Sequence, residues 1–307
     1  PITVRGRQAR AGGPVTDLRL GRWQDVLADD PADGTVRLIL TSPPYDNART
    51  YEGTNEPVDF GELAAWALLK LCPGGTLAMV LDGPCEGGRQ SITPYRVICE
   101  WSALEGWYFH QFLVYGRGGV PGNTKGWFRR DHEPLLVFIR EGGEQVCNKE
   151  RVAERGAKLA GRARSTRNAA GELVRSSSVG ALSSDIEHRG SIWWYGANGH
   201  GVDPSADTGH PATFAERFAR DAVDVWSNPG DLVVDPFAGS ATVGRACEDL
   251  GRRFIGAERV GSCPRCGGGF PERCACRSKD CPAGWLNYHA IGQARLAQRG
   301  LFGTEAR

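Results

Sequence analysis

Four consecutive residues near the start of the chain, Ser42-Pro43-Pro44-Tyr45, combine a hydroxyl group, two rigid rings and an aromatic side chain. They follow the apolar run 36–40 and Thr41. Such a run, ended by prolines, is typical of a buried parallel strand, and open α/β sheets bind their ligands at the carboxyl ends of such strands. Because proline has a fixed φ and no N–H, this bend keeps free carbonyl acceptors. The sequence predicts a site for a flat ligand that donates hydrogen bonds.

A second loop whose residues could bind a ligand, residues 235–242, has the sequence Asp-Pro-Phe-Ala-Gly-Ser-Ala-Thr. It lies between an expected strand at 232–234 and a helix, and the next expected strand, 253–257, is closed by Glu258. Small residues let a loop backbone approach a ligand at a helix N-terminus, and a carboxylate one unit later can accept hydrogen bonds from ribose hydroxyls. The loop has neither a Gly-x-Gly-x-x-Gly pattern nor a phosphate-binding lysine. It therefore predicts a nucleoside-containing cofactor other than a dinucleotide or a nucleoside triphosphate.

Half of the ten cysteines crowd into 19 residues near the end of the chain. Thiolates at this spacing predict a Cys₄ zinc site, and four thiolates leave no open position for catalysis, so the zinc is expected to be structural. An iron–sulfur cluster is the minor alternative. The preferred ligands are Cys263, Cys266, Cys276 and Cys281, with Cys274 as the alternative. The isolated cysteines are expected to be small core residues: Cys72, Cys85, Cys99, Cys147 and Cys247.

An alternation of apolar runs and helical periods must position these groups. Helices are expected at 60–71, 94–104 and 214–226 and after residue 242, with strands at 36–40, 76–81, 107–115, 134–139, 232–234 and 253–257. The aromatic segment 191–195 is expected to pack on the core. With 307 residues and 40% hydrophobic residues, the chain is predicted to form one large α/β domain with insertions.

Positive charge is local, because 37 Lys and Arg residues nearly balance 36 Asp and Glu residues. The segment 149–167 holds seven cations against two acids, and a Gly-rich loop at 116–130 interleaves cations with aromatic rings. Clustered cations with few apolar residues indicate an exposed segment that either contacts an anionic partner or is simply solvated. No apolar run approaches the roughly 18 residues of a membrane span, and the start of the chain has no signal-peptide core. We expect an intracellular protein.

Taken together, the two loops resemble those of amino-group DNA methyltransferases that use S-adenosylmethionine. That family pairs a Ser/Asp/Asn-Pro-Pro-Tyr/Phe catalytic loop with an Asp-Pro-Phe-x-Gly-Ser-Gly-Thr cofactor loop, and the order found here resembles its β class. Segments 129–134, 210–214 and 252–256 match as well. One departure is Ala241, which stands where the family has a second loop glycine. A methyl group there could crowd the loop, although alanine tolerates most turn geometries.

The resemblance implies a role for each matching residue. The catalytic set is Ser42, Pro43, Pro44 and Tyr45, and the cofactor set is Asp235, Phe237, Gly239, Ser240, Thr242, Glu258, Thr213 and Phe214. A target base must leave the duplex to reach this loop, where Tyr45 would stack on it. A serine in the first position favours N4 of cytosine over N6 of adenine. The cations expected on DNA are Lys125, Arg129, Arg130, Arg162 and Arg164.

The resulting prediction is an α/β fold with a Rossmann-like, mixed and mostly parallel methyltransferase sheet, an inserted recognition region and a zinc-binding insert. The expected boundaries are 15–145 for the catalytic half, 146–204 for DNA recognition and 205–303 for the cofactor half, with the zinc insert at 261–282. The expected partner is double-stranded DNA, in the cytoplasm of a bacterial or phage-infected cell, with homodimerisation and a restriction partner left open and no membrane contact. Rival hypotheses are an RNA or protein-amide methyltransferase and an inactive, zinc-bearing DNA-binding protein.

Overall fold

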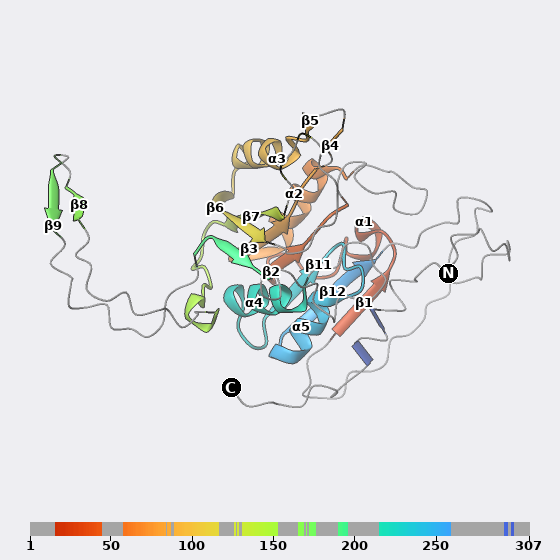
Figure 1. The fold of residues 1–307 in the computed structure, drawn as a ribbon. Coiled ribbons are helices and arrows are strands. Elements are labelled where there is room, and N and C mark those ends of the chain that lie inside the picture. The colour runs from red at the N-terminus through yellow and green to blue at the C-terminus, as the bar shows by residue number, and fades with distance from the viewer. Residues whose placement is uncertain are drawn as a thin grey trace.

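An eight-stranded sheet forms the centre of the protein in a computed structural model, with strand order β1-β12-β11-β2-β3-β7-β6-β10 (Figure 1). Neighbouring strands are parallel except at β7, which is antiparallel to both β3 and β6. This confirms the predicted mixed, mostly parallel sheet. The strands are β1 (Thr16–Leu20), β2 (Val36–Thr41), β3 (Leu71–Val80), β6 (Trp107–Gly116), β7 (His132–Arg140), β10 (Ile192–Trp194), β11 (Leu232–Asp235) and β12 (Arg253–Glu258).

The structure describes residues 16–44, 58–83, 85–86, 89–116, 126, 128, 131–152, 165–168, 170, 172–175, 190–195, 215–258, 292–293 and 296–297. Two small two-stranded sheets complete the strands: β4 (Cys85–Glu86) with β5 (Arg89–Gln90), and β8 (Ser165–Arg167) with β9 (Leu173–Arg175). Among the helices within these ranges, none has the length and apolar character needed to cross a membrane.

Helices cover both faces of the large sheet (Figure 1). One face packs against α1 (Trp23–Val26), α2 (Phe60–Lys70) and α3 (Thr93–Ser102), and the other against α4 (Glu216–Trp226) and α5 (Thr242–Leu250). The alternation of side chains along β2 explains the two cores, since Ile39 joins the first and Leu38 and Leu40 join the second. Each core contains residues from the first and from the second half of the chain, such as Leu18 with Phe254 and Trp23 with Ala257. The two halves therefore form one α/β unit around the sheet.

The junction of α2 and β3 differs from the sequence expectation. The pattern predicts that Cys72-Pro73-Gly74-Gly75 separates a helix from a strand, but α2 ends at Lys70 and β3 begins at once at Leu71. Pairing of Val36 with Leu71, and an irregular register between Val36 and Leu38, absorb this segment into the strand. A bulge of this kind admits residues that regular strands disfavour.

The prediction that the isolated cysteines are core residues is only partly correct. Cys247 is buried and Cys72 is half-buried, but Cys99 and Cys147 are exposed. On α3 the buried face carries Val97 and Trp101, which leaves Cys99 on the solvent side of the helix. The Cys85 side chain lies outside the described residues.

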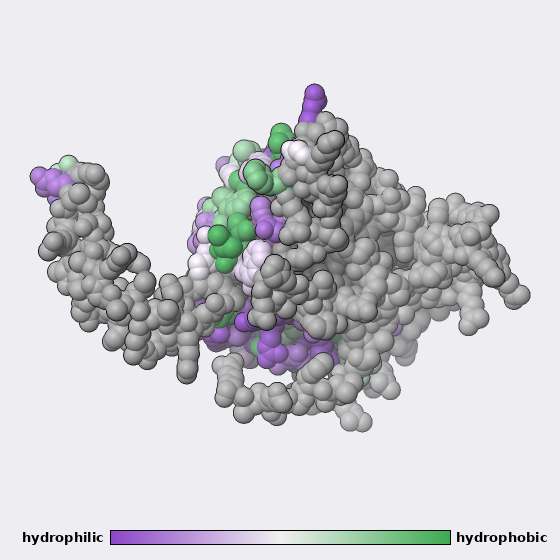
Figure 2. All heavy atoms as spheres, in the orientation of Figure 1, coloured by the Kyte–Doolittle hydropathy of each residue, from purple (hydrophilic) through white to green (hydrophobic). Residues whose placement is uncertain are grey.

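Aromatic side chains on β10 and α3 divide between the core and the surface. Trp193 is buried and stacks on Trp226 at 5.4 Å between ring centroids, as expected for core packing, whereas Trp194 is 42% exposed. Figure 2 shows apolar side chains gathered over α3 and the adjoining β6. Tyr95, which is 54% exposed, stacks there on Phe112 at 6.4 Å.

Candidate active site

Two loops 194 residues apart in sequence leave adjacent strands at the same edge of the sheet. Strands β2 and β11 are parallel neighbours, with Val234 opposite Ile39, so their carboxyl ends lie together. The Thr41 hydroxyl donates a hydrogen bond of 2.7 Å to Oδ1 of Asp235. The Ser-Pro-Pro segment starts at the next residue, with Pro43 buried and Ser42 and Pro44 half-buried. The fold therefore brings the residue before the first loop into direct contact with the first residue of the second loop.

The Asp235 carboxyl is the electrostatic centre of this contact. It is 2% exposed, and its Oδ1 also accepts a hydrogen bond of 3.0 Å from the Phe237 backbone N–H. Burial raises the pKa of the Asp235 carboxyl from 3.8 to about 7, although the hydrogen bonds from Thr41 and Phe237 favour the ionised form and oppose the shift. Desolvation outweighs the two donors, so this carboxyl changes its charge near neutral pH.

The cofactor loop is held against β12 by its backbone. The Gly239 N–H donates a hydrogen bond of 2.6 Å to Oε2 of Glu258, and the Ala238 N–H donates one of 2.8 Å to the Ala257 carbonyl. Strand β12 pairs in parallel with β11, and Glu258, its last residue, is half-exposed. The backbone of the loop is therefore tied to a partly accessible carboxylate.

Ala241 adopts the left-handed conformation that the glycine of the family pattern would adopt without strain. Its φ is 57° and its ψ is 37°, at the residue that precedes α5. For an L-residue with a Cβ this costs about 1–2 kcal/mol, so the turn is one of those that alanine adopts only with strain. The methyl group is fully buried and lies against Gly292, where an added Cβ would stand only 3.1 Å from that of Ala241. Gly292 thus makes room for the larger loop residue.

The remaining described residues of the cofactor loop face different surroundings. Phe237 is half-buried, and its ring meets Trp23 edge to face at 6.5 Å. Ser240 and Thr242 are 3% and 5% exposed, with their hydroxyl oxygens 3.4 Å apart. Their side chains face the interior, so the loop would offer mainly its backbone to a ligand.

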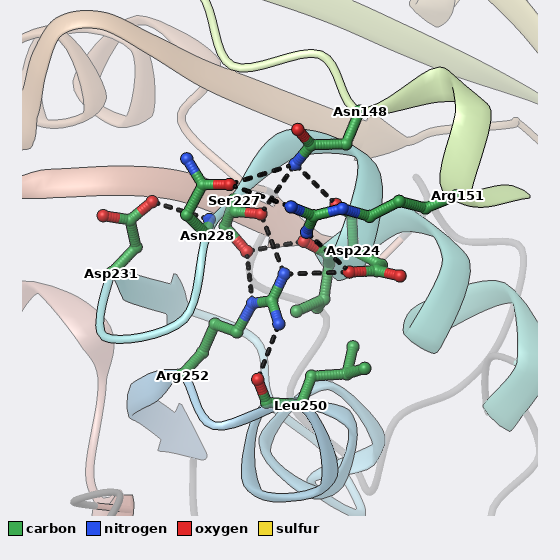
Figure 3. Close-up of polar contacts among 9 residues, drawn as sticks. Asn148, Arg151, Asp224, Ser227, Asn228, Asp231, Leu250 and Arg252 are labelled. Atoms are coloured by element: carbon green, nitrogen blue, oxygen red, sulfur yellow. Dashed lines mark hydrogen bonds and ion pairs between the residues drawn. The ribbon is translucent and has the colours of Figure 1, made fainter. Parts of the chain in front are cut away.

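A buried polar network supports the strands that carry the loop (Figure 3). The Arg252 guanidinium, 2% exposed, donates to the Asp224 carboxylate at 2.9 Å, to the Ser227 carbonyl at 2.8 Å and to the Leu250 carbonyl at 2.6 Å. These contacts join the end of α4 to the end of α5, next to the segments that lead into β11 and β12. A buried arginine is tolerated because its donors have partners.

The same network holds the start of the cation-rich segment. The helix η1 (Lys149–Val152) carries Arg151, which pairs with Asp224 at 3.1 Å, and Asn148 donates to the Ser227 carbonyl at 3.1 Å (Figure 3). At least one of the seven cations in 149–167 therefore has a structural partner.

Three polar residues at the active edge do not stand out in the sequence. Thr41 belongs to neither motif and draws notice only by its place before Ser42. Asp82 and Glu133, each 6% exposed, lie just beyond β3 and near the start of β7, two residues outside the pairing of Val80 with Leu135. The signal that could have found Asp82 is its place after an apolar run, the same rule that identifies Ser42.

Several predicted site residues lie outside the described residues, so their placement remains a prediction. They are Tyr45, Thr213, Phe214, Lys125, Arg129, Arg130, Arg162, Arg164, Cys263, Cys266, Cys274, Cys276 and Cys281. In the loop before β7, Phe128 is described and is 98% exposed. Within the described ranges no group of three or more His, Cys, Asp or Glu residues could hold a metal ion. The predicted zinc ligands lie outside these ranges, so this finding does not bear on them.

Comparison with known proteins agrees with this geometry. The N6/N4 methyltransferase family model, described as DNA methylase, matches residues 36–260. The chain belongs to this family.

The individual relatives share less than a third of their aligned residues with this chain. The chain is 29% identical over 239 residues to the orphan methyltransferase M.BamHII of Bacillus amyloliquefaciens, covering 76% of this chain and 87% of the relative. It is 25% identical over 298 residues to the type II methyltransferase M.XycI of Xanthomonas campestris pv. cyanopsidis, covering 84% and 85%.

Two solved structures share the fold at 18% identity. The M1.HpyAVI–SAM complex has a TM-score of 0.56 and covers 92% of this chain and 100% of its own. The cytosine-N4-specific PvuII DNA methyltransferase has a TM-score of 0.55 and covers 81% and 85%.

Proposed function

We propose that this DNA methylase transfers a methyl group from S-adenosylmethionine to the N4 amino group of a flipped cytosine in double-stranded DNA. The observation that carries the proposal is the hydrogen bond between Thr41 and Asp235, because it holds the strand end that precedes the expected methyl-acceptor loop against the first residue of the expected cofactor loop. A transfer between two bound molecules requires both sites to share one edge of the fold.

The described residues fit the cofactor. Glu258 ends β12 beside the loop and is half-exposed, which supports a role in which its carboxylate would accept hydrogen bonds from ribose hydroxyls. No described side chain caps the N-terminus of α5, and the first N–H groups of a helix favour a carboxylate such as that of the methionine moiety. Bound S-adenosylmethionine would supply an activated methyl group on sulfur. Asp235, Phe237 and Gly239 would contact the cofactor through the loop backbone.

The acceptor loop suits an exocyclic amino group. Such a nitrogen is conjugated to its ring and is a poor nucleophile, so its lone pair must be localised before it attacks a methyl group in line. The Pro43 carbonyl and the Ser42 hydroxyl can each accept a hydrogen bond from the amino group, and Tyr45 would stack on the base. Flipping the base costs a few kcal/mol, which stacking partly offsets.

The choice of cytosine rests on Ser42, because the resemblance associates serine in the first position with N4 of cytosine and aspartate with N6 of adenine. The PvuII enzyme, a structural neighbour, is named as cytosine-N4-specific. Adenine N6 is the alternative acceptor. Two more distant hypotheses are an enzyme that methylates RNA or a protein amide and a catalytically inactive, zinc-bearing DNA-binding protein.

The proposal extends to DNA binding and zinc. The cations Lys125, Arg129, Arg130, Arg162 and Arg164 would contact phosphates, so they should set the salt dependence of binding more than the choice of base. Zinc on Cys263, Cys266, Cys276 and Cys281 would support the fold between Glu258 and Gly292. The relative M.XycI is named a type II methyltransferase, and we propose that the present protein methylates DNA at a specific sequence.

The test is transfer of a labelled methyl group to duplex DNA, with RNA and peptide as competing acceptors, followed by mass spectrometry of the modified nucleosides. We expect N4-methylcytosine from the wild-type protein and no product from Ser42→Ala, which should still bind S-adenosylmethionine. Ser102→Ala changes an exposed serine on α3 and is the matched control. N6-methyladenine would correct the choice of base, and the absence of transfer to DNA would refute the proposal.

A further inference from the structure

The Thr41 side chain connects the end of β2 to the first residue of the cofactor loop, although Thr41 itself belongs to neither motif. Thr41 is fully buried at the end of β2, and its hydroxyl donates 2.7 Å to Asp235. The next residue along the chain is Ser42. A displacement of Asp235 is therefore passed on to the residue that precedes the acceptor loop.

One carboxylate oxygen makes this link specific. Oδ1 of Asp235 accepts both from the Thr41 hydroxyl and from the Phe237 backbone N–H at 3.0 Å. Phe237 belongs to the cofactor loop, whose Gly239 N–H bonds to Glu258 at 2.6 Å. The chain of contacts runs from the expected ribose ligand along the cofactor loop to the residue before the acceptor loop. Its last contact, between Asp235 and Thr41, is buried, where water does not compete for the hydrogen bond.

We infer that Thr41 is a positioning residue that sets the acceptor loop relative to the cofactor loop and couples cofactor binding to the placement of Ser42. The inference rests on the proposed function. Methyl transfer needs an in-line approach, and a misplacement of about 1 Å can lower a rate by about 100-fold. A threonine that merely stabilised the fold would affect the amount of folded protein and leave the rate of each folded molecule unchanged.

The chain offers well-matched variants. Thr41→Val has nearly the same shape and replaces the hydroxyl with a methyl group, whereas Thr41→Ser keeps the hydroxyl. Thr76→Val is the control, because Thr76 is also fully buried and lies on the neighbouring strand β3, opposite Leu38. Its hydroxyl has no hydrogen-bond partner among the described residues.

The first measurement separates the turnover number from binding. We expect Thr41→Val to lower kcat for DNA methylation by about 10- to 100-fold at saturating DNA and cofactor, with the Kd for S-adenosylmethionine changed less than about threefold. Thr41→Ser should restore most of kcat, and Thr76→Val should match the wild type. A wild-type kcat in folded Thr41→Val would overturn the inference.

The second measurement does not depend on the DNA substrate. Hydrogen–deuterium exchange of the peptide that spans residues 36–50 is followed with and without S-adenosylmethionine. We expect the cofactor to slow exchange at this peptide in the wild type and in Thr76→Val but not in Thr41→Val. Equal protection in Thr41→Val, or none in the wild type, would overturn the coupling. If the wild type methylates no DNA, the proposed function fails, while the exchange still decides the role of Thr41.

Discussion

Replacing Asp235 by asparagine should change how the stability of the protein depends on pH. Asparagine has nearly the same shape and keeps an oxygen that can accept from Thr41 and Phe237, but it does not ionise. In the wild type, burial raises the pKa of the Asp235 carboxyl to about 7, against an ordinary value of 3.8. The folded state therefore binds a proton that the unfolded state has already released at neutral pH.

The sign and size of the effect follow from this difference. Preferential protonation of the folded state stabilises it fully below pH 3.8, and this stabilisation is lost as the pH rises through about 7. For these two pKa values the loss between about pH 5 and about pH 8 is roughly 2–3 kcal/mol of unfolding free energy. The Asp235→Asn variant lacks this contribution. Its unfolding free energy should therefore rise relative to that of the wild type by roughly 2–3 kcal/mol between about pH 5 and about pH 8.

Urea unfolding of both proteins in steps between about pH 5 and about pH 8 measures the difference directly. Histidines and other groups titrate in both proteins, so the difference between the two curves isolates Asp235. Asp29→Asn, which changes an exposed carboxyl, is the matched control and should follow the wild type. Parallel curves for the wild type and Asp235→Asn would refute the assignment of a raised pKa to this carboxyl.

Three further predictions concern the support of the site. Arg252→Met should lower the unfolding free energy by about 1–3 kcal/mol, because it removes the buried donor to the Leu250 carbonyl and leaves the Asp224 carboxylate with Arg151 alone; Arg253→Met, an exposed neighbour, should cost less than about 1 kcal/mol, and equal losses in urea unfolding would contradict the role of the network. Gly256→Ala should weaken S-adenosylmethionine binding in calorimetry, since its Cβ would stand 2.6 Å from the Phe254 ring and 3.0 Å from the Ala238 Cβ; an unchanged Kd would show that the loop absorbs the methyl group. Metal analysis should find one zinc per chain, and a chelator should lower the melting temperature; a metal-free protein of unchanged stability would exclude the structural zinc.

Much of the fold could be predicted from local pattern. The apolar runs at 36–40 and 232–234 became β2 and β11, and the helical periods at 60–71 and 214–226 became α2 and α4 within a few residues. The start of β3 could not be predicted, because pairing with β2 overrides the helix-breaking preference of Cys72-Pro73-Gly74-Gly75. The exposure of Cys99 could not be predicted either, since cysteine occurs both in cores and on surfaces and its residue type does not reveal which face of α3 it occupies.

For the site, the sequence by itself identified the candidate groups: Ser42 with its prolines, the loop from Asp235 and the carboxylate of Glu258 were all recognisable from residue type and spacing. Only the tertiary structure decided how they meet. Parallel pairing of β2 with β11 places Thr41 against Asp235, and burial in that contact moves the carboxyl pKa towards neutrality. The strain at Ala241 and the room that Gly292 leaves for it are likewise properties of packing. Residue type limits what a side chain can do, but its neighbours and its access to water decide its charge and its position.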